Sequence, residues 1–157
     1  MKKLFLLLLF SPLIGNSQNA NDIIDRITMI QFIVDNPNGQ LVYRQTKNWC
    51  TDFLDFNENQ IEAANELYNN QYLNLAIAYK KYNESHSSAN LHELIKVIVR
   101  QEYFFRRLLN DKQLKDYNVK FDEALANPEN PKNKAFNALF ISDKLLFEYN
   151  ETIAGKD

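Results

Sequence analysis

Phe56-Asn57-Glu58-Asn59-Gln60-Ile61 is a stretch that returns later in the chain as Leu109-Asn110-Asp111-Lys112-Gln113-Leu114. Both copies read apolar-Asn-x-x-Gln-apolar, and we call the pair the twin motif. The Asn of each copy is an expected helix N-cap, because its side-chain oxygen accepts from a backbone N–H one turn ahead. The Gln can reach back to the N–H of the cap residue and close a capping box, and the flanking apolar residues predict a hydrophobic staple. The twin motif therefore predicts two helix starts, capped by Asn57 with Gln60 and by Asn110 with Gln113.

The rest of the chain is poor in residues that break helices. After residue 17 only Gly39 and Gly155 remain as glycines, and strong breakers cluster at 36–39 and at 127–131. No sustained alternation of apolar and polar residues lies between these clusters. Both observations favour an all-α fold.

The apolar periodicity places the helices. On the second helix we expect Val42, Trp49 and Phe53 to face inward, and on the last helix Phe136, Phe140 and Phe147. The expected architecture is an elongated antiparallel helical hairpin with flanking helices. The expected ranges are about 21–35, 40–55, 58–83, 89–108, from the second motif to 125, and 132–152.

The first residues predict export. Lys2 and Lys3 precede an apolar run over 4–14, and Gly15-Asn16-Ser17 is a small-x-small cleavage site. The run is shorter than the ~20 residues that span a bilayer, although an uncleaved anchor is the alternative. We therefore expect a signal peptide over 1–17, one domain over 18–157, a periplasmic or secreted location and no stable membrane insertion.

The charge of the chain is acidic overall but unevenly distributed. The net charge is −2, and it becomes −4 for residues 18–157 because Lys2 and Lys3 are the only charged residues before them. This balance argues against a nucleic-acid partner. The stretch 80–107 nevertheless carries six basic residues and only three acidic ones. That stretch is either a solvated helix face or a binding patch.

Residues for catalysis are not arranged in any familiar pattern. The sequence has no Gly-rich phosphate loop and no Cys-x-x-Cys, so we expect no enzyme, no catalytic residue and no cofactor. His92-Glu93 begins like a zinc-protease motif, but Lys96 stands where the second His belongs. We expect no metal site, and ordinary exposed histidines are favoured over ligation by His86, His92 and Glu93. The lone Cys50 is either buried beside its apolar neighbours or available for an intermolecular disulfide.

An aromatic triplet is the most distinctive surface candidate. Tyr103, Phe104 and Phe105 are consecutive, and successive side chains of a helix point about 100° apart, so one core cannot absorb all three. We expect Phe105, like Tyr68 and Tyr79, to be core. Arg100, Tyr103, Phe104 and Arg106 are candidates for a binding face, because binding surfaces favour aromatic and Arg side chains. A core stripe edged by solvated arginines is the alternative.

The twin motif resembles the twin Leu-Thr-x-x-Gln motif of the Spy/CpxP family of periplasmic stress proteins, with Asn in place of Thr. Both residues are good N-caps. The likeness covers roughly 51–125, including the amphipathic stretch 115–123. It implies an ATP-independent, chaperone-like protein that binds unfolded or misfolded proteins, with two chains forming a curved, antiparallel homodimer.

Two other functions are compatible with the same residues. A periplasmic regulator would contact the sensor domain of a membrane signalling protein, and a helical bundle could have neither activity. Client breadth separates the first two, because a chaperone protects unrelated proteins whereas a regulator binds one partner.

Overall fold

The computed structural model describes residues 17–154, and the side chains of residues 23–151. The predicted signal peptide falls on residues 1–17, of which 1–16 lie outside the described part. All regular structure in the described part is α-helical, which confirms the predicted all-α fold. The helices are α2 (Ser17–Asp35), α3 (Gly39–Phe53), α4 (Glu58–Ser85), α5 (Ser88–Arg106), α6 (Asp111–Ala126), α7 (Pro131–Leu139) and α8 (Asp143–Ala154).

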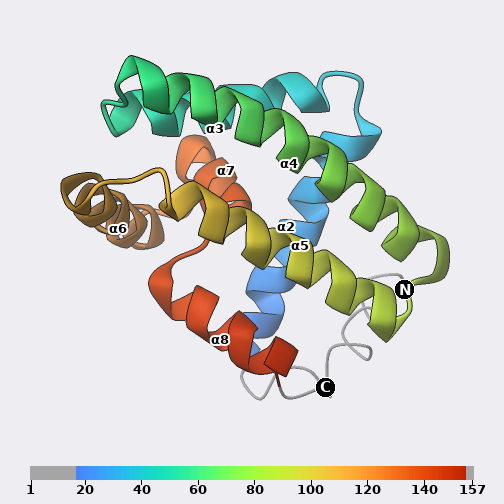
Figure 1. The fold of residues 1–157 in the computed structure, drawn as a ribbon. Helices are drawn as coiled ribbons and strands as arrows, with labels where there is room; N and C mark the ends of the chain where they lie inside the picture. Colours follow the sequence, from blue (N-terminus) through green and yellow to red (C-terminus); the bar gives the residue numbers. More distant parts are fainter. Residues whose placement is uncertain (1–16, 155–157) are drawn as a thin grey trace.

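The long helices α4 and α5 form an antiparallel hairpin, seen in green and yellow in Figure 1. His86 ends α4 in the left-handed conformation, and Ser87 caps α5 by accepting from the backbone N–H of Asn90 at 3.2 Å. Helix α3 packs beside α4, α2 packs against both of them, and α8 packs along α5. The hairpin with flanking helices agrees with the sequence prediction.

The corner between α2 and α3 depends on Gly39. A Cβ atom on this residue would lie 2.0 Å from the backbone oxygen of Ile33, far inside contact distance. The corner also contains a hydrogen bond of 2.9 Å from the Gly39 N–H to the carbonyl oxygen of Asn36. Close approach of two backbones is what requires glycine here.

The core is rich in aromatic rings. Phe105 lies at its centre, with the rings of Phe56, Tyr68, Tyr117 and Phe140 at centroid distances of 5.1 to 6.3 Å. The predictions that Tyr68, Tyr79 and Phe105 are core residues are confirmed, since all three are at most 2% exposed. Cys50 is fully buried as well, and burial raises the pKa of its thiol.

The predicted inner face of the second helix is wrong for Phe53 and right only in part for Trp49, which packs against the edge of the core. Phe53 is 43% exposed, and Val42 and Trp49 are only partly buried. The buried face of α3 instead carries Gly39, Tyr43, Lys47, Cys50 and Thr51. Lysine is rarely buried without a partner, and the partner of Lys47, the Leu139 carbonyl, is distant in the chain.

The single helix predicted over 132–152 is also wrong, because it breaks after Leu139. Phe140 has an extended backbone, with φ −126° and ψ 164°, and α8 begins again at Asp143. The side chain of Ser142 accepts from the N–H of Leu145 at 3.3 Å, as an N-cap does. Phe147, which the prediction placed inward, is 67% exposed.

Four charged side chains hold this break, and we call them the backbone clamp: Arg26, Lys47, Glu102 and Arg106. Lys47 donates to the Leu139 carbonyl at 3.2 Å, and Arg26 donates to the Phe140 carbonyl at 2.6 Å. Glu102 accepts from the Ile141 N–H at 3.1 Å, and Arg106 donates to the Ile141 carbonyl at 2.8 Å. Backbone groups that leave a helix need other partners when buried, and α2, α3 and α5 supply them.

None of the helices in the part of the chain that the structure describes is long and apolar enough to cross a membrane.

Candidate functional site

Both halves of the twin motif form complete capping boxes, as predicted. The backbone N–H of Gln60 donates to Asn57 at 3.0 Å, and the Asn57 N–H donates back to the Gln60 side chain at 3.1 Å. The second copy repeats the pattern between Gln113 and Asn110 at 2.9 and 3.0 Å. The twin motif therefore starts α4 and α6.

The two boxes also bond to each other, which the sequence did not predict. Gln60 Nε2 donates to Gln113 Oε1 at 2.8 Å, and Gln113 Nε2 donates to Gln60 Oε1 at 3.2 Å. Each amide also reaches a carbonyl in the segment before the other helix, Gln60 to Leu108 at 2.6 Å and Gln113 to Leu54 at 3.0 Å. We call this arrangement the Gln junction, and it joins the start of α4 to the start of α6.

The hydrophobic staples are less regular than the caps. Phe56 is buried and stacks on Phe105, whereas Ile61 is 41% exposed. Leu109 and Leu114 are both partly buried against the core. The apolar residues of the first motif are therefore divided between the core and the surface.

The four predicted binding residues do not share one surface. Arg100 and Phe104 line a groove along α4 and α5. Tyr103, although 47% exposed, points to α8, where its hydroxyl accepts from Asn150 Nδ2 at 2.6 Å. The prediction that at least one aromatic of the triplet is displayed is confirmed, since Phe104 is also 47% exposed and Phe105 is buried.

Arg106 belongs to the core side of the helix. Only 11% of its side chain is exposed, and it is paired with Glu102 at 2.7 Å and with Asp143. It also lies over the Tyr117 ring, 5.2 Å from the centroid. Its expected place on an exposed stripe with Arg100 and Tyr103 is therefore wrong, because its charge is already neutralised within the protein.

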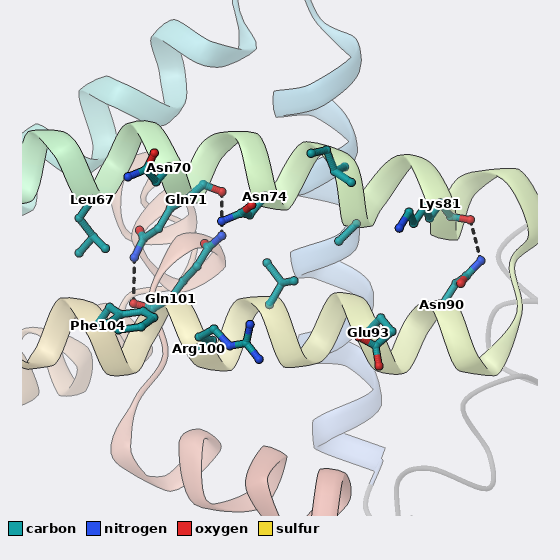
Figure 2. Close-up of a pocket in the computed structure, with 13 residues that line it drawn as sticks. Leu67, Asn70, Gln71, Asn74, Lys81, Asn90, Glu93, Arg100, Gln101 and Phe104 are labelled. Atoms are coloured by element: carbon teal, nitrogen blue, oxygen red, sulfur yellow. Dashed lines mark hydrogen bonds between the residues drawn. The ribbon is translucent and has the colours of Figure 1, made fainter.

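The groove along the α4–α5 hairpin has a volume of about 550 Å³. Gln71 and Gln101 cross-link its walls, each donating its side-chain amide to the main-chain carbonyl of the other, at 2.9 and 2.8 Å (Figure 2). Nearer the hairpin turn, Asn90 Nδ2 donates to the carbonyl of Lys81 at 2.9 Å. These three bonds fix the register of the two helices along the groove.

Two cations and two large apolar side chains of the groove are exposed. Lys81 and Arg100 form no ion pair within the described residues, whereas Glu93 is paired with Lys96 at 3.5 Å. Ile77 is 55% exposed and Phe104 is 47% exposed. The groove therefore combines positive charge with accessible apolar surface.

A second polar cluster is buried. Lys47 lies over the Phe140 ring at 4.0 Å and near the rings of Tyr43 and Tyr68, both at 5.5 Å. Burial lowers the pKa of Lys47 from 10.5 to about 8, opposed by the charge of Glu102. Glu102 itself accepts from the Tyr117 hydroxyl at 2.8 Å as well as from Arg106. Lys47 and Glu102 belong to the backbone clamp, and their polar groups already have hydrogen-bond partners within the protein.

The two histidines lie on different elements, His86 at the end of α4 and His92 in α5. The His86 ring lies 5.2 Å from the Tyr82 ring at the end of α4. Among the residues that the structure describes, no group of three His, Cys, Asp or Glu side chains could hold a metal ion.

No protein-family model, curated protein or solved structure matches this chain. The likeness to the Spy/CpxP family therefore rests on the twin-motif residues themselves.

Proposed function

We propose that this chain is an exported, ATP-independent, chaperone-like protein that holds unfolded proteins in the α4–α5 groove. The observation that carries the proposal is the exposure of Phe104 and Ile77 beside the cations Arg100 and Lys81, which have no ion partner among the described residues. Aromatic and Arg side chains are enriched where proteins bind other proteins. The twin motif, whose two copies form capping boxes, carries the resemblance that implies this function.

The groove suits loose binding of many clients. An exposed cation attracts acidic segments over a screening length of about 8 Å at physiological ionic strength. Short-range contacts with Phe104 and Ile77 then add apolar area, at roughly 25 cal/mol per Å² buried. Neither contribution needs a fixed client fold, so unrelated unfolded proteins are accepted.

Aggregation suppression tests this function. Two unrelated client proteins are denatured, each in the presence of the parent protein, the Phe104→Ser variant or the Phe147→Ser variant. Phe147 is the matched control, because it is an exposed aromatic on α8 that does not line the groove. We expect Phe104→Ser to lose most of the protection and Phe147→Ser to keep it, with both retaining helical circular dichroism.

The same assay separates the alternatives. Protection of neither client by the parent would reject a chaperone and favour the regulator, which binds one sensor domain, or a bundle with neither activity. Equal protection by both variants would reject the groove as the binding surface.

Export is part of the proposal and has its own measurement. Mass spectrometry of the protein recovered outside the cytoplasm should give a chain that begins near Gln18. Recovery of the intact chain in the membrane fraction would reject cleavage at Ser17. The homodimer also stays a prediction, which sedimentation of the processed protein would test.

A further inference from the structure

We propose that the α4–α5 groove binds an extended polypeptide, with Asn70 and Asn74 forming hydrogen bonds to its main chain. The groove selects segments in which acidic side chains alternate with apolar ones. The inference deepens the proposed function and rests on it, since it specifies what part of an unfolded protein the groove takes. The site consists of Asn70, Asn74, Ile77 and Lys81 on α4 and Arg100 and Phe104 on α5.

Asn70 and Asn74 form a ladder of unused amides. They are four residues apart on α4, both are exposed in the groove, and neither side chain makes a hydrogen bond within the described residues. Each amide carries a donor and an acceptor. Figure 2 shows both on the α4 wall, with Asn74 across from Arg100 and Asn70 across from Phe104.

The spacing of this ladder matches a β-strand. Four residues of an α-helix advance about 6 Å, and two residues of an extended chain advance about 6.6 Å. Successive peptide groups on one edge of an extended segment can therefore each meet one Asn amide. A helical ligand offers no such groups, because its backbone bonds are internal. The ladder accordingly favours an extended occupant.

The register of the hairpin places the other side chains at similar intervals. Gln101 lies beside Gln71 and Asn90 beside Lys81, so Arg100 lies near the level of residue 72 on α4. At about 1.5 Å per residue, Arg100 and Lys81 are separated by roughly 14 Å along the groove. This is close to the ~13 Å that four residues of an extended chain cover.

Apolar side chains alternate with the two cations. Ile77 lies between the levels of Arg100 and Lys81, and Phe104 lies about one helical turn beyond Arg100. Each step corresponds to roughly two residues of an extended chain, and such residues point to the same face. The complementary segment is therefore apolar-x-acidic-x-apolar-x-acidic. Its two carboxylates would meet Arg100 and Lys81, while Glu93 is held by Lys96.

Peptide binding tests the inference. The probe is a fluorescein-labelled peptide with two repeats of Leu-Ser-Glu-Ser followed by one more Leu, which shows the same pattern in either direction. Anisotropy is measured with the processed protein at low salt, beside a peptide with Lys in place of Glu and one with N-methylated serines. We expect saturable binding of the first peptide and at least tenfold weaker binding of the other two.

Two sets of variants assign the contacts. Asn70→Ala with Asn74→Ala should weaken binding of the Glu peptide about tenfold, whereas Asn65→Ala with Asn83→Ala should not change it. The control pair is exposed on the same helix, outside the groove. Lys81→Ser with Arg100→Ser should weaken binding at low salt and remove most of its dependence on salt.

The outcomes separate this inference from the proposed function. One outcome is that the protein suppresses aggregation and yet binds all three peptides equally well. That result would overturn the inference and leave the proposed function standing. Selective peptide binding without suppression would support the site and reject the chaperone. Unchanged affinity in Asn70→Ala with Asn74→Ala would overturn main-chain recognition.

Discussion

Gln60 and Gln113 exchange two side-chain hydrogen bonds, of 2.8 and 3.2 Å, while each also closes the capping box of its own helix. The starts of α4 and α6 are thus coupled through one pair of amides. Each amide additionally bonds a carbonyl before the other helix, at Leu108 or Leu54. A repeated local signal in the sequence therefore corresponds to one tertiary contact.

The Gln junction predicts non-additive stabilities. Gln60→Ala and Gln113→Ala should each lower the free energy of unfolding, because each leaves buried or half-buried carbonyl groups without a donor. The double variant should lose less than the sum, with an interaction energy of about 0.5–3 kcal/mol. Urea unfolding of the four proteins measures this cycle, and strictly additive losses would show that the two motifs act independently.

The caps predict a smaller, local effect. Asn57→Ala and Asn110→Ala should each cost about 0.5–2 kcal/mol, because the first turn of α4 or α6 loses its side-chain acceptor. Asn57→Ser retains an acceptor and should be nearly neutral. Asn65→Ala, at an exposed position inside α4, is the control and should not destabilise, since Ala is the better helix former. Unchanged urea midpoints in both cap variants would contradict the capping assignment.

The corner between α2 and α3 predicts a severe effect from one methyl group. Gly39→Ala places a Cβ against the backbone oxygen of Ile33, so α3 must move away from α2. We expect a loss of about 1–3 kcal/mol, the usual range for overpacking. Gln40→Ala, at the next and exposed position, should change little. A thermal melt of Gly39→Ala that overlays the parent would contradict the close approach of these backbones.

The buried lysine predicts a specific pH dependence. Burial lowers the folded pKa of Lys47 to about 8 from 10.5, so between these values the unfolded chain binds more protons and stability rises with pH. Glu102 and Cys50 oppose the shift, and Arg26 favours it. Between pH 7 and 9.5 the parent should gain about 2 kcal/mol relative to Lys47→Met.

The comparison with Lys47→Met isolates one group. Unfolding free energies of both proteins are measured at each pH, so the opposite contributions of Cys50 and Tyr43, whose pKa values burial raises, are common to both. A difference between the proteins that does not change with pH would mean that Lys47 keeps an ordinary pKa in the folded state.

Local signals of the sequence are confirmed more often than distant ones. Asn57 and Gln60 lie within one turn, so their chemistry is visible in six residues. The break after Leu139 is not visible in the local sequence. The side chains that bond its free backbone groups are distant, Lys47 on α3 and Glu102 on α5. An apolar pattern that continues through the break therefore predicts one helix.

The predicted binding residues show the same contrast between local and distant signals. The predictions that Phe105 is buried and that at least one aromatic of the triplet is displayed are confirmed, because helix geometry fixes the relative directions of the three rings. The expectation that Arg106 lies at the surface is wrong, because it pairs with Glu102 one turn away and with Asp143, which only the fold brings near. Asn70 and Asn74 were missed because exposed asparagines are common in this chain and only the groove distinguishes these two.

Site-specific photo-crosslinking tests the central claim most directly. A benzoylphenylalanine is placed at Phe104 in the groove or at Phe147, the exposed aromatic on α8, and the protein is irradiated with a client as it unfolds. Binding in the α4–α5 groove predicts a strong client adduct from position 104, lost when the client is native, and little adduct from position 147. Equal adducts from both positions, or none from position 104, would contradict it.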